Sequence, residues 1–316
     1  MQSWHNMEER NVLSTIYGYF LFILSVGLLI LNTILCGSLV LIGGFLKFLI
    51  PIPILQTLIA KGMTQSMRLW GIFNGWNMKY VVRIRIDVQG NGLDNLSMDN
   101  WYLVLSNHAS GLDIPVLCYV FRHKIPMLKF FLKKQLLYIP FMGWGCWALD
   151  MPFMHRYSAN QLKKKPHLKG KDLENTRKAC LKFKNIPTTV MNFVEGGRFT
   201  QAKKQRQQSP YMHLLKPKAS GLAFAISSLG EQFDKVLNVT LMYPESRVLN
   251  QSILSAALMG RLDHVIVQVD TLDTPSVDEN AFVYDREARK QFQAWLNQVW
   301  KEKDECITKN YQMFDA

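Results

Sequence analysis

The feature that most constrains this chain is a long uncharged segment near its N-terminus. From Asn11 to Leu46 the sequence contains no Lys, Arg, Asp or Glu, and most positions are Leu, Ile, Val, Phe or Gly. A membrane-spanning helix needs about 20 apolar residues, so this segment is long enough to enter a bilayer. A cleaved signal peptide is the alternative, but its apolar core is shorter and follows a basic leader, whereas Glu8 and Glu9 precede this segment. We therefore predict a membrane anchor.

The apolar stretch continues beyond Lys47, so it is too long for one untilted helix. Either one helix spans the bilayer and a second lies at its interface, or the two form a hairpin that enters the bilayer. Gly43-Gly44 or the prolines Pro51 and Pro53 could mark the bend. We expect residues 1–61 to be the anchor and residues 62–316 to be the catalytic domain.

The charge distribution gives an orientation and a class of partner. The formal net charge is +13, which suits an anionic surface, either nucleic acid or a leaflet with acidic lipid. Basic residues follow the anchor, so the positive-inside rule places the catalytic domain on the cytoplasmic face. The runs at 163–165 and 203–206 lie in polar loops that are either solvated or near the leaflet. Because no recognition helix or stacking platform is visible, we expect no nucleic-acid partner.

Cysteines and histidines set further limits. The five cysteines are scattered and form no close pair, which favours neither a disulfide framework nor a zinc site. This usage agrees with a reducing compartment. The histidines are scattered too, so we expect no metal site.

Strand-like and helical segments alternate after the anchor. The predicted strands cover residues 80–86, 101–105, 188–194, 236–243 and 264–269. The predicted helices cover residues 114–121, 171–184, 217–229 and 284–303, and another helix connects the anchor to the first strand. On the last helix Phe292, Trp295, Leu296 and Val299 share one face. This pattern predicts an α/β fold with a mixed central sheet flanked by helices and an N-terminal membrane-embedded helix or helix pair.

The strongest candidate for catalysis is the pair His108 and Asp113. A buried strand ends just before Asn107-His108-Ala109-Ser110, and a helix follows, so side chains here are held rigidly at the edge of the sheet. An alcohol needs a base to attack a thioester near neutral pH. His108 can take the hydroxyl proton while Asp113 orients the ring and stabilises the imidazolium. Ser110 is a conceivable nucleophile, but no Gly-x-Ser-x-Gly elbow surrounds it.

The His-x4-Asp spacing alone is weak, because the sequence contains a second copy at His167 and Asp172. That copy lies in a lysine- and proline-containing loop to which no strand leads. We interpret the second copy as a coincidence.

Five blocks in a fixed order resemble the glycerolipid acyltransferase family, including the lysophosphatidic-acid acyltransferases of the PlsC type. The resemblance covers about residue 70 to residue 245. The first is Asn107-His108-x-Ser110-x-x-Asp113, followed by a linking stretch at 133–144. The second, at 149–156, ends in Arg156, the third is Phe193-Val194-Glu195-Gly196-Gly197-Arg198, and the fourth covers 239–244. The residues from Ala148 to Arg156, together with Leu214-Leu215-Lys216-Pro217-Lys218, are similar to those of the bacterial YihG-type branch, which implies a bacterial inner membrane.

The resemblance implies an enzyme that joins an acyl group to a lysophospholipid hydroxyl, with acyl-CoA or acyl carrier protein as co-substrate and no cofactor. It implies that Glu195, Gly196 and Arg198 bind the glycerol-phosphate part of the acceptor, assisted by Arg156. Arg198 is suited to a bidentate phosphate contact. Lys133 stands where the family has a lysine near the thioester carbonyl, where it could stabilise the oxyanion, although a membrane contact is equally open. Asn107 and Ser110 complete the predicted site.

The third block departs from the family's usual Pro-Glu-Gly-Thr-Arg at two positions. Gly197 replaces Thr and Val194 replaces Pro. Since Glu195 and Arg198 remain, activity is expected, but the acceptor is open: lysophosphatidic acid is the first choice. A lysophospholipid with a head group, such as lysophosphatidylglycerol or lysophosphatidylinositol, is the alternative. From other classes, a membrane lipid hydrolase using the same pair and a non-catalytic membrane-binding protein stay open.

An aromatic and basic stretch lies between the first two blocks. Its residues could contact the membrane interface, line a tunnel for the acyl chain, or pack in the core. Its apolar members are Met127, Phe130, Phe131, Leu132, Leu136, Leu137, Phe141, Trp144 and Trp147.

Overall fold

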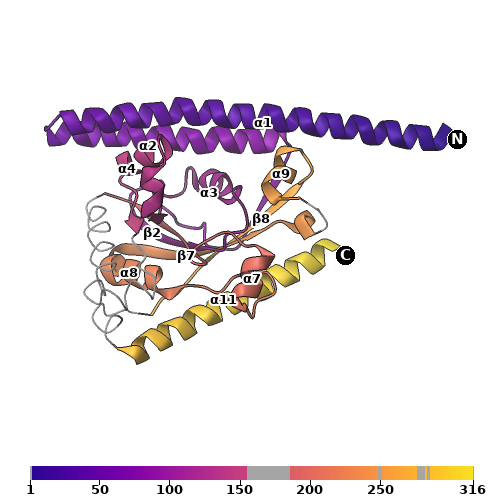
Figure 1. Cartoon of the computed structure of the whole chain (residues 1–316). Helices are drawn as coiled ribbons and strands as arrows, with labels where there is room; N and C mark the ends of the chain where they lie inside the picture. Colours follow the sequence, from indigo (N-terminus) through magenta and orange to yellow (C-terminus); the bar gives the residue numbers. More distant parts are fainter. Residues whose placement is uncertain (1, 155–185, 248–250, 276–281, 283–284, 316) are drawn as a thin grey trace.

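Two long helices form a hairpin along one side of the molecule (Figure 1). The computed structural model describes residues 2–154, 186–247, 251–275, 282 and 285–315. Helix α1 covers Gln2–Leu49 and helix α2 covers Pro53–Trp76. The chain reverses between them at residues 50–52, where Pro53 occupies the first turn of α2, as favoured by its fixed φ. The two helices thus form a hairpin, and whether one or both of them enter a bilayer stays a prediction.

The prolines, and not the two glycines, mark the bend. Gly43 lies in the middle of contact between the helices, because a Cβ there would stand 2.5 Å from Cγ of Met63 in α2. A Cβ on Gly44 would stand 2.6 Å from Cβ of Ala148. These glycines therefore permit close packing inside an unbroken helix.

Helix α1 is apolar and largely exposed. Within the described residues, Val12–Leu49 is the one helical segment long and apolar enough to cross a membrane. It comprises 38 residues, about 57 Å at about 1.5 Å per residue, well beyond the bilayer's apolar core of about 30 Å. Large apolar side chains project outward along its length, such as Ile23, Leu31 and Phe48. Length and composition thus agree with the predicted anchor.

The first predicted strand is displaced. Residues Asn77–Val81 form a π-helical turn (η1), closed by Val82 N–H donating to Asn77 O, and strand β1 begins only at Arg85. Apolar and charged residues alternate here as in a strand, but the side chain of Asn77 donates to Ser25 O in α1. Contact with the hairpin therefore keeps this segment helical. Arg83, with φ of 61°, then turns the chain toward the sheet.

A six-stranded sheet forms the centre of the domain, in the order β1-β8-β7-β2-β6-β3. Strands β7 and β8 pair antiparallel and the other neighbours pair parallel, which confirms the mixed sheet. Its strands are β1 (Arg85–Gln89), β2 (Trp101–Ser106), β3 (Leu128–Phe130), β6 (Thr189–Phe193), β7 (Phe233–Met242) and β8 (His264–Thr271). A second sheet pairs β4 (Leu132–Lys133) with β5 (Phe153–Met154).

Helices cover both faces of the sheet. Because side chains alternate along a strand, Tyr102 and Val104 of β2 join the core beneath α3 (Asp113–Phe121) and the hairpin. Leu103 and Leu105 join the opposite core, beneath α8 (Ala219–Leu229) and α11 (Arg286–Asp315). Figure 1 shows α11 on the far side of the sheet from α1 and α2. The fold class is thus as predicted.

Short elements complete the described chain. They are η2 (Lys134–Tyr138), α4 (Met142–Ala148), α7 (Gln201–Gln207), η4 (Gly230–Gln232), η5 (Pro244–Arg247) and α9 (Ile253–Leu258). The basic run at 203–206, expected to be a loop, lies in α7. That helix forms because the Thr200 side chain accepts a hydrogen bond from Lys203 N–H at its start.

The aromatic stretch divides between two environments. Leu128 and Phe130 are buried in the core as part of β3, whereas Tyr138, Trp144 and Trp147 are exposed around α4. The predicted helix at 171–184, the basic run at 163–165 and the second His-x4-Asp copy lie outside the described residues. The boundary at residue 61 stays a prediction, and α2 runs across it without a break.

Candidate active site

Three neighbouring parallel strands deliver the candidate residues to one edge of the sheet. Strand β2 pairs with β6 on one side and with β7 on the other, so their carboxyl ends lie together. His108 follows β2, Glu195 follows β6 and Tyr243 follows β7. This is the position where ligands bind in open α/β sheets.

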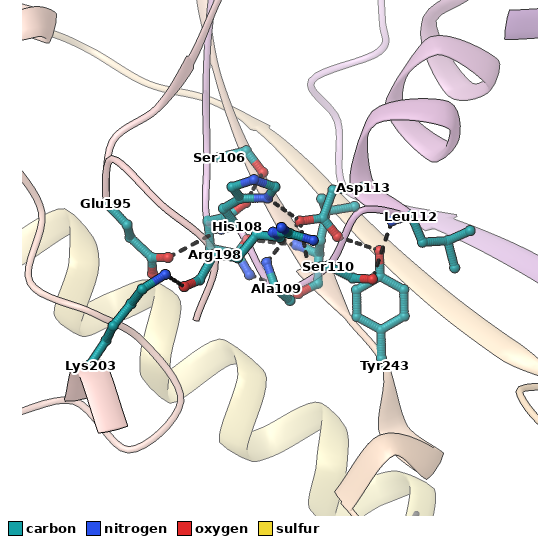
Figure 2. A network of polar contacts seen from close by, with 12 residues as sticks. Ser106, His108, Ala109, Ser110, Leu112, Asp113, Glu195, Arg198, Lys203 and Tyr243 are labelled. Carbon is teal, nitrogen blue, oxygen red and sulfur yellow. Dashed lines mark hydrogen bonds and ion pairs between the residues drawn. The ribbon is translucent and has the colours of Figure 1, made fainter. Parts of the chain in front are cut away.

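His108 and Asp113 form the predicted pair (Figure 2). The two are joined by a hydrogen bond of 2.7 Å between Nδ1 of His108 and Oδ2 of Asp113. Oδ2 also accepts the backbone N–H groups of Ala109 at 2.8 Å and Ser110 at 3.0 Å. Asp113 is fully buried in the first turn of α3, where the helix dipole favours a negative charge.

One face of the imidazole is packed as well. Its ring stacks on Phe193 with centroids 4.0 Å apart. Since Nδ1 faces Asp113, the neutral ring carries its proton there, and Nε2 is left as the acceptor. In the described part of the chain no side chain forms a hydrogen bond with Nε2. The geometry is that of an oriented general base.

Asn107 and Ser110 hold the loop that carries the pair. The amide of Asn107 donates to Leu241 O at 2.9 Å and accepts from Leu241 N–H at 2.8 Å. The hydroxyl of Ser110 accepts from Leu112 N–H at 3.2 Å. Both side chains are buried and engaged with backbone, so their visible role is to fix the loop. Their predicted contact with substrate stays a prediction.

Glu195 connects three loops. One carboxylate oxygen accepts the backbone N–H of His108 at 3.2 Å, and the other accepts that of Leu215 at 3.1 Å. The side chain is 1% exposed. Burial raises the pKa of Glu195 to about 7 despite the two backbone donors, which lower it. Beneath it, burial lowers the pKa of Lys303 in α11 to about 7.

Arg198 is the exposed cation of the site. It follows a turn in which Gly196 adopts a φ of 70°, a conformation that favours glycine. Lys203 donates from Nζ to the Arg198 carbonyl at 2.7 Å, which fixes the backbone beneath the guanidinium. A Cβ on Gly197 would lie 3.6 Å from that Nζ, so the missing threonine side chain leaves room beside Lys203.

The structure leaves the side chains of two predicted residues undescribed. Lys133 ends β4, where its backbone pairs with Met154, but its side chain is outside what the structure describes. Arg156 lies outside the described residues. Their roles stay predictions.

Tyr243 is a site residue to which sequence reasoning gave no role. Its hydroxyl donates to Oδ1 of Asp113 at 2.5 Å, across 130 residues of sequence. Tyr243 lies in the fourth sequence block, immediately before its last residue, Pro244. The sequence signal is its place at the carboxyl end of the predicted strand 236–243, whereas the pairing of that strand with β2 is seen only in the structure.

Comparisons with known proteins identify the family of this chain. The sequence model of the family described as Acyltransferase matches residues 86–246, just over half of the chain. The 1-acyl-sn-glycerol-3-phosphate acyltransferase 3 of Arabidopsis thaliana is 30% identical over 190 residues, 55% of this chain and 46% of that protein. The chain thus spans about half the length of this relative. Lysocardiolipin acyltransferase 1 of Gallus gallus is 22% identical over 295 residues, 87% of this chain and 70% of that protein.

A solved structure has the same fold. The 1-acyl-sn-glycerophosphate (LPA) acyltransferase PlsC from Thermotoga maritima superposes with a TM-score of 0.50 at 20% sequence identity, covering 98% of each chain. At this identity the likeness concerns the fold. Together with the family match over the residues that carry His108, Asp113, Glu195 and Arg198, it leads to one conclusion. The chain belongs to the glycerolipid acyltransferases of the Acyltransferase family.

Proposed function

We propose that this protein transfers a fatty acyl group from a thioester, carried by CoA or acyl carrier protein, to the free hydroxyl of a lysophospholipid. Lysophosphatidic acid is the first choice of acceptor. The observation that carries the proposal is the bond of 2.7 Å between His108 Nδ1 and Asp113 Oδ2. It presents Nε2 as a base beside an exposed arginine suited to a phosphate.

In this mechanism the acceptor oxygen attacks the thioester carbonyl carbon while His108 Nε2 takes the hydroxyl proton. Asp113 stabilises the imidazolium that forms. The tetrahedral intermediate then collapses, the carbon–sulfur bond breaks, and the leaving thiolate receives the proton from His108. Ester and free thiol are the products. The protein supplies no nucleophile, in keeping with the buried, backbone-bound hydroxyl of Ser110.

The phosphate contact is assigned to Arg198, and Glu195 is assigned an indirect role. Arg198 is exposed next to the catalytic loop, since its Nη1 would stand 3.8 Å from a Cβ on Gly111. Glu195 is buried and both of its oxygens accept backbone N–H groups, so it holds the loops in register. Arg156 and Lys133 are proposed to assist the acceptor phosphate and the thioester oxyanion, respectively.

The membrane association of the protein is proposed to reside in the helical hairpin. The exposed apolar length of α1 and the aromatic side chains around α4 support a contact with lipid. Both substrates carry acyl chains, so a catalytic domain held at the bilayer surface receives them directly. The positive-inside rule places that domain on the cytoplasmic face, in a bacterium that of the inner membrane.

A lysophospholipid with a larger head group is the second candidate acceptor. The chain matches a protein named lysocardiolipin acyltransferase over 87% of its own length. Gly197 removes the threonine side chain beside Arg198 and leaves room there. Both points favour an acceptor with more than a phosphate monoester.

The deciding experiment uses full-length protein in detergent with acyl-CoA or acyl carrier protein and a panel of lysolipids. Transfer predicts a diacyl product that depends on the lysolipid and falls about 10²–10⁴-fold in His108→Ala. Fatty acid released equally fast without lysolipid would instead identify a hydrolase. An unchanged rate in His108→Ala would refute the general-base role.

A further inference from the structure

The environment of Asp113 contains a donor that the reaction scheme above leaves without a role. Asp113 has two carboxylate oxygens, and Oδ2 is already shared among His108 Nδ1 and two backbone N–H groups. Oδ1 receives one side-chain donor, the hydroxyl of Tyr243 at 2.5 Å. Figure 2 shows Tyr243 reaching Asp113 from the side opposite His108.

Tyr243 is built into the interior. Its side chain is 1% exposed, and its backbone N–H donates to the hydroxyl of Tyr311 in α11 at 3.2 Å. Burial, together with the negative charge of Asp113, raises the pKa of Tyr243 well above its ordinary value. The phenol therefore keeps its proton and acts as a permanent donor to Asp113.

The supporting helix lies beyond the part of the chain that defines the family. The family match ends at residue 246, whereas Tyr311 lies in α11, which begins at Arg286. Hydrogen bonds thus connect Tyr311 in the C-terminal helix, through Tyr243, to the carboxylate of Asp113.

From this geometry, and on the basis of the proposed function, we propose that Tyr243 is a positioning residue of the catalytic pair. Its hydroxyl fixes the Asp113 carboxylate in the plane that aims His108 Nδ1–H and withdraws charge from that carboxylate. Hydrogen bonds to a charged group are stronger than neutral ones, so losing this donor should lower kcat about tenfold.

The withdrawal of charge has a defined sign. Without the donor, Asp113 attracts the imidazolium proton more strongly, so His108 holds its proton up to a higher pH. The neutral form of His108 is then populated only at higher pH, so the acidic limb of the pH–rate profile moves to higher pH. Among the residues that the structure describes, the other ionisable groups near the pair are Glu195 and Arg198 after β6, and Lys303 and Tyr311 in α11. These groups are the same in the wild type and in the variants at Tyr243 and Tyr102 that are compared below.

The test compares Tyr243→Phe with Tyr102→Phe. Tyr102 is the matched control, because it is fully buried and its hydroxyl accepts a hydrogen bond from Ser97 N–H at 2.8 Å, away from Asp113. We expect Tyr243→Phe to lower kcat about tenfold, with the acceptor KM within about twofold and the acidic limb moved upward. Tyr102→Phe should leave the acidic limb where the wild type has it. Equal profiles for wild type and Tyr243→Phe would overturn the inference, as would the same displacement in both variants.

A second substitution tests the inference without relying on the folding of the Tyr243→Phe variant. Replacing Tyr243 by 3-fluorotyrosine keeps the shape and makes the phenol a stronger donor, so the acidic limb should move to lower pH. A limb that stays in place or moves upward would refute the role. Wild-type protein is assayed in parallel: if it forms no diacyl product with any lysolipid, the proposed function fails, whereas active wild type with unmoved variants defeats only this inference.

Discussion

The carboxylate of Glu195 accepts the backbone N–H of His108 at 3.2 Å, although 87 residues separate the two in the sequence. The same carboxylate accepts the backbone N–H of Leu215 at 3.1 Å. A residue of the third sequence block thus fixes the backbone of the first. Through this contact a buried acid supports the candidate site by holding its backbone.

Glu195→Gln should change how stability depends on pH. The folded-state pKa of Glu195 is about 7, above its ordinary 4.5, so the folded protein favours the protonated acid. Its contribution is full below about pH 4.5 and is lost as the pH rises through about 7. As the pH rises between these two values, the free energy of unfolding of the wild type should therefore decrease relative to that of the glutamine variant. Denaturant unfolding in detergent across this range measures it, and parallel curves would contradict the raised pKa.

Asp113→Asn should abolish most of the activity while the fold persists. The amide resembles the carboxylate in shape but no longer favours the tautomer with the proton on Nδ1, and it does not stabilise the imidazolium. In serine hydrolases the same change costs about 10⁴ in kcat, and we expect a loss of that order. Single-turnover acyl transfer with saturating lysolipid measures the loss. A variant within tenfold of wild type would remove Asp113 from the catalytic pair.

Gly75→Ala should destabilise the protein. A Cβ on Gly75 of α2 would stand 1.9 Å from Cδ2 of Tyr119 in α3, so the helix that begins with Asp113 would be displaced. Overpacking of this kind costs about 1–3 kcal/mol. Gly62→Ala is the control in the same helix, because no atom lies within 4 Å of its Cβ position. Alanine there should raise stability by up to about 1 kcal/mol.

The two glycine variants are compared by thermal unfolding in the same detergent. Opposite signs are expected for Gly75→Ala and Gly62→Ala. If both lower stability equally, the packing of α2 against α3 is not the cause.

Arg198→Ala should weaken binding of the acceptor more than it slows the chemical step. Two or more hydrogen bonds to a phosphate are lost, so the acceptor KM should rise about tenfold or more. Arg198→Lys should recover only part of this loss, since a lysine cannot form the bidentate contact. Initial rates over a range of lysolipid concentrations separate the two parameters. An unchanged KM in Arg198→Ala would place the phosphate elsewhere.

The order of the sequence blocks predicted the family, the alternation of strands and helices predicted the α/β sheet, and the strand before His108 predicted its pairing with Asp113. These follow from local properties. A buried strand followed by a polar turn and a helix places its loop at the carboxyl edge of the sheet wherever it occurs. Likewise, an uncharged apolar segment of that length forms a helix that exposes apolar side chains.

The tertiary structure decided what depends on contacts between distant residues. Nothing local to residues 77–81 predicts a π-helical turn, which is held by the contact of Asn77 with α1. The position of Glu195 beneath His108 and that of Tyr243 behind Asp113 follow from the adjacency of β6, β2 and β7. Strand order is set by packing of the whole sheet, which a single sequence does not encode position by position. The sequence therefore predicted the candidate base and its carboxylate, and the tertiary structure showed the residues that hold them.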